Sequence, residues 1–240
     1  MDTLSDPKKS LSAAKPAAAK PAAIKPAPIK PAKPAKVTRD PEGTRARILA
    51  AATEEFARHG LGGARVERIA EVAGTNKRML YYHVGNKESL YLAVLEGAYA
   101  HIRATERTLS LETLDPPAAI ARLIHFTWQY FLDHPEFMAL LNIENLHRAE
   151  LLKTSDKVHA MHSPFVQMIA DVLARGVATG IFRTGVDPVQ LYISIAGQSY
   201  FYLSNVHTLS VIFGRDLLAE EAKAERLDHM VELILSSLRA

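Results

Sequence analysis

Residues 64–91 read ARVERIAEVAGTNKRMLYYHVGNKESLY, and this stretch decides the fold. Its apolar residues recur at helical spacing on both sides of Gly74, a pattern typical of two short helices joined by a tight turn. Asn76 is a good N-cap for the second helix, expected over 77–84, and a second glycine ends it before Lys87 begins a third. Two short helices packed at a steep angle predict a helix-turn-helix, whose second helix enters the major groove of DNA.

The helix expected over 77–84 carries charged and aromatic side chains on its exposed face. With Leu80 set inward and a step of about 100° per residue, Arg78 and Tyr82 point nearly opposite, with Met79 and Tyr81 on the flanks. An arginine can pair with a guanine edge, a tyrosine hydroxyl can donate to phosphate, and a thioether can touch a thymine methyl. An exposed tyrosine pair is equally typical of a protein–protein interface, and spacing alone leaves both interpretations open.

Further basic residues surround this helix. Lys87 stands at the start of the next helix, where free backbone N–H groups and the helix dipole favour a phosphate. Arg45, Arg47 and Arg65 are placed to contact the DNA backbone on either side. These positions extend the predicted DNA-contacting surface beyond the reading helix.

The chain has 240 residues and a formal net charge of +3, which is unevenly distributed. Residues 1–40 hold nine Lys/Arg against three Asp, and residues 41–90 hold eight Lys/Arg against six Glu. Residues 91–240 therefore carry a net charge of −5. A basic front and an acidic back predict a polyanionic partner for the N-terminal part alone. Because the chain has no cysteine, disulfides and thiolate metal sites are excluded.

Three regions are predicted along the chain. Residues 1–40 repeat Lys, Pro and Ala, and we expect a disordered tail with polyproline character. The tail is either a solubilising leader or a non-specific phosphate-binding arm, and the sequence favours neither. Residues 41–90 form a three-helix headpiece, and residues 91–240 form a helical bundle. With no alternating strand pattern, the fold class is all-α, with helices expected over 44–59, 65–73, 77–84, 87–109, 117–133, 135–151, 163–176, 188–213 and 219–238.

One segment, Pro188–Gly214, carries no charged residue and is the candidate for a membrane span. Its Gln190, Gln198, Asn205 and His207 are too polar for hydrocarbon, so we predict a buried helix in a soluble protein. The basic N-terminus is not followed by an apolar run with a cleavage site, so no secretory signal is expected. The predicted location is the cytoplasm.

Aromatic and polar side chains mix in three helices of the C-terminal region, as in ligand pockets that combine apolar walls with a few polar groups. An aromatic stripe at helical spacing is also typical of ordinary core, and this alternative stays open. His159 and His162 lie three residues apart, but ten histidines produce such pairs by chance, so we predict neither a metal site nor a cofactor. The predicted ligand-binding residues are Trp128, Asn142, Asn145, His147, Tyr192, Gln198 and Tyr202.

The run IAEVAGTNKRMLYYHVGNKESLY closely resembles the sequence typical of TetR-family repressors. The matching features are the Ile-Ala pair, Gly74, the Leu-Tyr-Tyr-His-Val series and a lysine after Gly-Asn. The resemblance is strong over 44–95, extends as a helix pattern through the rest, and is absent in 1–40. It implies a helix-turn-helix joined by a long helix to a ligand-binding and dimerising domain. It also implies a homodimer that leaves its double-stranded operator when a small molecule binds, with the last two helices at the two-fold interface.

Carried over by position, the DNA contacts of the family fall on seven residues between 77 and 87. The chain departs from the family where Ala64-Arg65 replaces a capping Thr or Ser, and where Arg78 or Met79 replaces a smaller residue, so the operator sequence is not predicted. The segment HPEFMALLNIENLHRAELL further resembles repressors of heterocycle catabolism, such as those controlling nicotinate or pyrimidine breakdown, which implies an aromatic or heterocyclic effector. The full set of predicted DNA-contacting residues is Arg45, Arg65, Asn76, Lys77, Arg78, Met79, Tyr81, Tyr82, His83 and Lys87.

These observations predict a sequence-specific transcriptional repressor that a small molecule releases from DNA and that controls a catabolic or efflux operon. The alternative is a DNA-architectural protein that binds mainly through its basic tail. An enzyme is not expected, because no nucleophile–base spacing, phosphate-binding loop or metal-ligand motif appears.

Overall fold

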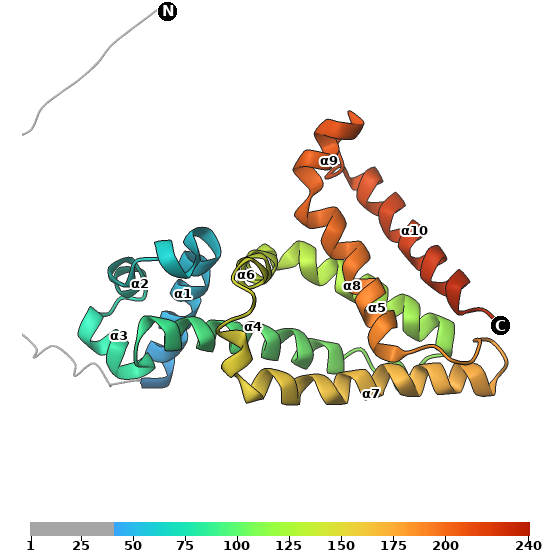
Figure 1. Ribbon diagram of the computed structural model, residues 1–240, viewed down its shortest axis with the longest axis horizontal. Coiled ribbons are helices and arrows are strands. Elements are labelled where there is room, and N and C mark those ends of the chain that lie inside the picture. Colours follow the sequence, from blue (N-terminus) through green and yellow to red (C-terminus); the bar gives the residue numbers. More distant parts are fainter. Residues whose placement is uncertain (1–40) are drawn as a thin grey trace, which may run out of the picture. The chain divides into compact units, whose positions relative to one another are not determined.

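The structure is a computed structural model and describes residues 41–240. The tail predicted for residues 1–40 lies outside the described residues. Within residues 41–240 the chain forms ten α-helices and two short 3-10 helices. An isolated bridge between Phe182 and Arg239 is the sole pairing of extended backbone in this range. Figure 1 shows how the helices are arranged. The predicted all-α fold is therefore confirmed.

The N-terminal helices share one hydrophobic cluster. The cluster buries Phe56, Ile69 and Leu80 together. The Tyr91 ring meets the Phe56 ring edge-on, with 5.0 Å between the ring centres. This cluster fixes the second helix against the third and leaves the opposite side of the third helix exposed. The three helices are α1 (Pro41–Gly63), α2 (Val66–Val72) and α3 (Lys77–Val84).

The long helix α4 (Lys87–Arg107) begins in the headpiece core, where Leu90 and Tyr91 are buried, and continues into the bundle. There it lies alongside α7, while α6 packs against α1 (Figure 1). Within residues 41–240, no helix combines the length and apolarity that a membrane crossing requires. The remaining helices are α5 (Pro116–Asp133), α6 (Pro135–Leu146), α7 (Asp156–Ala178), α8 (Pro188–Ser204), α9 (Val206–Phe213) and α10 (Glu220–Leu238), with 3-10 turns at Leu111–Thr113 and Leu152–Thr154.

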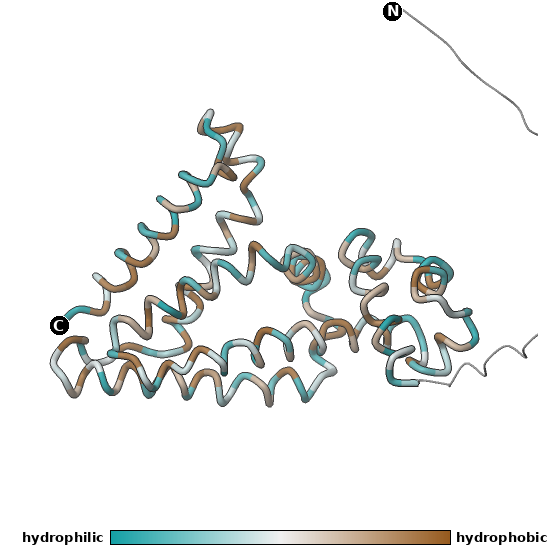
Figure 2. Tube along the Cα trace, turned by 180° about the vertical axis from the view of Figure 1, so that it is seen from behind, coloured by the Kyte–Doolittle hydropathy of each residue, from teal (hydrophilic) through white to brown (hydrophobic). Residues whose placement is uncertain are grey.

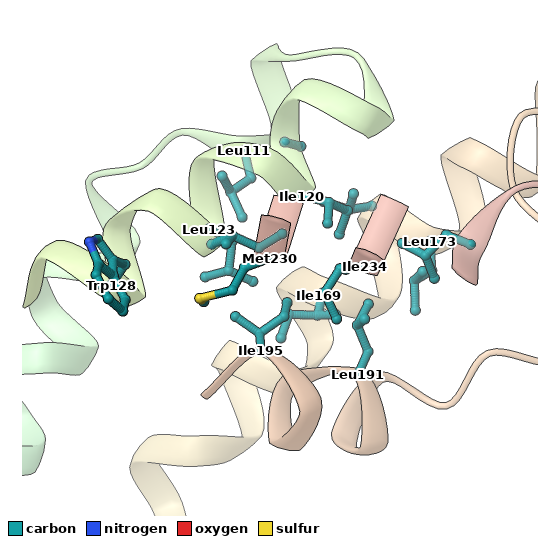
Figure 3. Packing of buried hydrophobic residues seen from close by; sticks show 14 of the residues in the cluster. Leu111, Ile120, Leu123, Trp128, Ile169, Leu173, Leu191, Ile195, Met230 and Ile234 are labelled. Carbon is teal, nitrogen blue, oxygen red and sulfur yellow. The ribbon is translucent and has the colours of Figure 1, made fainter. Parts of the chain in front are cut away.

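A second cluster forms the core of the bundle. Hydrophobic and hydrophilic residues alternate turn by turn along α7 and α10, as in helices with one buried face (Figure 2). Figure 3 shows side chains from four helices meeting in this core: Ile120 and Leu123 of α5, Ile169 and Leu173 of α7, Leu191 and Ile195 of α8, and Met230 and Ile234 of α10.

The boundaries of four predicted helices are wrong. Helix α1 spans Pro41–Gly63 instead of 44–59, with non-helical backbone at Gly60. Helix α7 begins at Asp156, not at Ser163, and carries Pro164 inside it. Pro164 and Ala160 are both exposed, so the carbonyl that loses its helical hydrogen bond is at the protein surface. Helix α6 ends at Leu146, because the chain turns through left-handed backbone two residues later. The single helix predicted over 188–213 is broken at Asn205, which separates α8 from α9.

Candidate nucleic-acid interface

The turn between α2 and α3 is closed by backbone and side-chain hydrogen bonds. Gly74 has a φ of 64°, a left-handed conformation that glycine adopts without steric cost. The amide of Thr75 donates to the carbonyl of Ala70 at 2.9 Å, which ends α2. The Oδ1 atom of Asn76 then accepts from the Met79 amide at 2.9 Å, so the predicted N-cap of α3 is confirmed.

The start of α2 is capped from another helix. Its N-cap position, Arg65, makes no capping bond with its own side chain, as expected where Ala64 replaces a Ser or Thr. Instead the Oε1 atom of Glu55, on α1, accepts from the Arg65 amide at 2.9 Å. Glu55 is 6% exposed, and its Oε2 atom lies 3.5 Å from Nη1 of Arg68 and 3.8 Å from Nε2 of His59.

Sequence reasoning missed Glu55, although a signal for it was available. It lies one turn from Ala52 and beside Phe56, on the face of α1 that is otherwise apolar and buried. A carboxylate on a buried face needs a hydrogen-bond donor, and the free amides at the start of a helix supply one.

The exposed face of α3 matches the orientation expected from the helical repeat. Leu80 is fully buried, whereas Tyr82 is 80% and Met79 40% exposed, and Arg78 is exposed between them. Tyr81 is half-buried on the flank. Within residues 41–240 no hydrogen bond or ion pair holds the Arg78 guanidinium, so its donors are available for a partner.

Lys77, the first residue of α3, is paired with a carboxylate. Its ammonium lies 2.6 Å from Oε1 of Glu67 on α2, and it also lies 5.9 Å from the centre of the Tyr81 ring. The hydrogen bond between Lys77 and Glu67 lowers the pKa of the Glu67 carboxyl and raises the pKa of Lys77. Both side chains are exposed, so the pair can open at little cost when a phosphate approaches.

The flanking basic residues are placed differently from one another. Arg45 and Arg65 are exposed, and Lys87 is half-buried at the start of α4, which Asn86 caps by accepting from the Ser89 amide at 2.7 Å. His83 is half-buried in the last turn of α3. Arg47 has a structural contact that was not anticipated: its Nε donates to the carbonyl of Ala73 at 3.2 Å, which ties α1 to the turn.

The predicted ligand-binding residues do not come together. Trp128 and Tyr202 pack edge-on at 5.5 Å in the bundle core, and the Tyr202 hydroxyl donates to the carbonyl of Leu217 at 2.8 Å. This arrangement fits the alternative of ordinary core packing that the sequence left open. Gln198, on the same helix as Tyr202, is half-buried, and its backbone carbonyl accepts from Arg226.

The other four candidates lie elsewhere. Asn142 and His147 line a groove between α6 and α1, and Asn142 is hydrogen-bonded to the Tyr200 hydroxyl. Asn145 is exposed and donates to the carbonyl of Leu141 in its own helix at 2.9 Å. Tyr192, on α8, accepts a hydrogen bond from a buried arginine of α4.

The chain matches two protein-family models. One describes bacterial regulatory proteins of the tetR family and covers residues 48–94, and the other describes a tetracyclin repressor-like C-terminal domain and covers residues 116–234. The transcriptional repressor NicS of Pseudomonas putida is 39% identical over 82% of this chain and 92% of its own length. The transcriptional regulator RutR of Escherichia coli is 28% identical over 80% of this chain and 89% of its own.

Solved structures resemble the described fold as well. The crystal structure of a transcriptional regulator from Streptomyces coelicolor superimposes with a TM-score of 0.58 and is 26% identical. The match covers 81% of this chain and 98% of that one. The similarity therefore extends over both the headpiece and the bundle.

Proposed function

Because this chain belongs to the TetR family of bacterial transcriptional regulators, we propose that residues 41–90 hold α3 in the major groove of an operator and that residues 91–240 bind an effector and a second copy of the chain. Relatives of this chain are named transcriptional repressors, so a DNA-architectural role is not favoured. The observation that carries the proposal is the exposed face of α3, with a free guanidinium between an exposed phenol and an exposed thioether.

The residues of this face would have distinct tasks. Arg78 is suited to paired hydrogen bonds with a guanine edge, and Met79 to a thymine methyl. Tyr81, Tyr82 and Lys87 would contact phosphates. The remaining proposed contacts, which orient the headpiece on the DNA backbone, are Arg45, Arg65, Asn76, Lys77 and His83.

A second copy would complete the DNA-binding unit. Apolar side chains on α8 and α9 are left exposed within residues 41–240, among them Ile193, Phe201 and Phe213. Patches of this kind on a single chain mark interaction surfaces. In a two-fold dimer, two copies of α3 would have to lie about 34–36 Å apart to reach successive turns of the major groove.

Release from DNA would follow from a change in that separation. An effector shifts operator affinity only by its preference between the two shapes of the dimer. Helix α4 offers a path, since it begins in the headpiece core and ends among the bundle helices. We propose an aromatic or heterocyclic effector, a cytoplasmic location and no catalytic activity, all supported by membership in a family of regulators.

Binding-site selection from random DNA with the full chain tests the proposal. We expect a pseudo-palindromic site whose half-sites are one helical turn, or a multiple of it, apart. Lys87→Ala and Tyr81→Phe should weaken binding to all sequences, whereas Arg78→Ala should also relax the preference at one position by about 1–3 kcal/mol. Equal effects of the three substitutions on every sequence would contradict the assigned roles.

Deleting residues 1–36 separates the repressor from the architectural alternative. A repressor keeps its sharp footprint and loses only salt-sensitive background binding, because phosphate contacts carry no sequence information. Loss of most of the affinity for the selected site would favour the architectural role.

A further inference from the structure

An arginine and a glutamate are buried side by side in the bundle. Arg103 and Glu106 lie one turn apart on α4 and are 3% and 1% exposed. The Nη1 atom of the arginine lies 3.0 Å from Oε2 of the glutamate. Burying two charges costs more than their attraction returns unless hydrogen bonds complete the arrangement.

Those hydrogen bonds are missing within residues 41–240. The Nε and Nη1 atoms of Arg103 and both carboxylate oxygens of Glu106 have no hydrogen-bond partner there. The 3.0 Å approach is thus a charge contact without hydrogen-bond geometry. Four unsatisfied polar atoms at one place are unusual for a protein core and mark it as a site that a ligand could complete.

Aromatic rings surround the guanidinium. Its central carbon lies 4.0 Å from the centre of the Phe165 ring and 5.3 Å from that of Tyr192, whose hydroxyl accepts from Nη2 at 2.8 Å. The rings of Phe165 and Tyr192 meet edge-on at 4.8 Å. These residues come from α7 and α8, so three helices of the bundle converge on Arg103.

Burial of Glu106 weakens its carboxyl as a counter-charge for the arginine. Burial raises the pKa of the Glu106 carboxyl to about 8, although the neighbouring Arg103 lowers it. Burial therefore favours the neutral form of the carboxyl, whereas a guanidinium keeps its charge. The site then offers one fixed positive charge, one carboxylic O–H donor and flat apolar walls.

We propose that Arg103 anchors the effector and that the effector is an aromatic or heteroaromatic carboxylate. Its carboxylate accepts from the free donors of Arg103, its ring packs against Phe165 and Tyr192, and protonated Glu106 donates to the carboxylate or a ring heteroatom. A single negative charge matches the single uncompensated charge of the site. The inference rests on the proposed function, because it names the ligand class of a regulator that releases DNA.

Acid and amide pairs of the same shape test the ligand class. The full chain is titrated with benzoate and benzamide, and with nicotinate and nicotinamide, by calorimetry and thermal melting. We expect at least one acid to bind and to raise the melting temperature by roughly 5–10 °C at about a hundred times its Kd. Its amide should bind at least about tenfold more weakly. If neither acid binds, or an amide binds as tightly as its acid, the proposal is wrong.

Three substitutions test the residues. Arg103→Met should weaken binding of the acid by at least about tenfold, since hydrogen bonds to a charged group are lost. Glu106→Gln removes the residual negative charge beside the arginine and should keep or tighten binding. Arg226→Met is the matched control, because that arginine lies 5.5 Å from the Tyr202 ring in the same bundle but apart from this cluster. Unchanged binding by Arg103→Met, or an equal loss in the control, would overturn the proposal.

The double variant Arg103→Met/Glu106→Gln guards against misfolding of the single one, because it leaves no buried charge uncompensated. It should fold and still fail to bind the acid. Operator binding without ligand is measured in parallel, so failure of the proposed DNA-binding function is seen separately as loss of the footprint in the unsubstituted chain. A protein that binds its operator and is released equally well by acid and amide would refute this inference alone.

Discussion

Replacing Glu55 should loosen the beginning of α2. Glu55→Ala removes the acceptor of the Arg65 amide, and losing a helix cap costs about 1 kcal/mol, with a range of about 0.5–2. The contacts with Arg68 and His59, whose side chains are roughly half exposed, add about 0–1 kcal/mol. We therefore expect a loss of about 2 kcal/mol in the free energy of unfolding and a fall of about 4–8 °C in the melting temperature.

Hydrogen exchange locates the effect. In Glu55→Ala, peptides covering residues 64–72 should exchange faster than in the unsubstituted chain, while those of α8 and α10 should not change. Glu55→Gln keeps a side-chain oxygen as acceptor and should cost about half as much. The neighbouring Glu54 is a matched control, since it is exposed and, within residues 41–240, takes part in a single ion pair, with Arg58 at 4.0 Å.

Two results would refute this reasoning. If Glu54→Ala lowers the melting temperature as much as Glu55→Ala, the effect is one of surface charge and not of capping. If Glu55→Gln is as damaging as Glu55→Ala, the carboxylate acts through its charge alone.

Three further outcomes follow from other contacts. Glu67→Gln frees the lysine that begins α3 and should tighten DNA binding severalfold at low salt, with a steeper salt dependence in fluorescence anisotropy. Gly176→Ala places a methyl group 2.0 Å from the Phe182 ring and should cost about 1–3 kcal/mol in denaturant unfolding, whereas Gly97→Ala meets open space and should not destabilise. Folding raises the pKa of Glu106, so the contribution of this carboxyl to the free energy of unfolding is fully present below about pH 4 and is lost as pH rises towards 8. Glu106→Gln should therefore melt progressively higher than the unsubstituted chain as pH increases from 5 to 8. A constant difference in melting temperature would contradict the raised pKa.

Helices that bear strong local patterns were predicted well from the sequence. The bounds of α3 follow from Asn76 at one end and Gly85 at the other, and the structure has the same bounds. Its burial pattern follows from the helical repeat, which places Leu80 inward. The bounds and the buried face of α3 depend on neighbouring residues alone, and so they can be predicted without knowledge of the rest of the fold.

Boundaries set by tertiary contacts were not predicted. The sequence predicts a helix from residue 163, whereas α7 begins at Asp156 and carries Pro164 on its exposed side, where a lost hydrogen bond costs less. The break at Asn205 has no proline or glycine to signal it.

The candidate pocket was the least predictable part. Its proposed residues were chosen as aromatic or polar side chains on separate helices, and only Tyr192 lies at the cluster around Arg103. A signal was present in α4, where the buried stripe of Tyr91, Leu95 and Ile102 continues into Arg103 and Glu106.

The outward side chains of α3 have almost no part in holding the headpiece together. The position of α3 in the headpiece depends on buried Leu80, on the caps supplied by Asn76 and Glu55, and on the turn at Gly74. Arg78 and Tyr82 project into solvent. Exposed positions of this kind tolerate exchange within about 0.5 kcal/mol. A lineage carrying this scaffold can therefore acquire new target sites by swapping these residues, without compensating changes elsewhere.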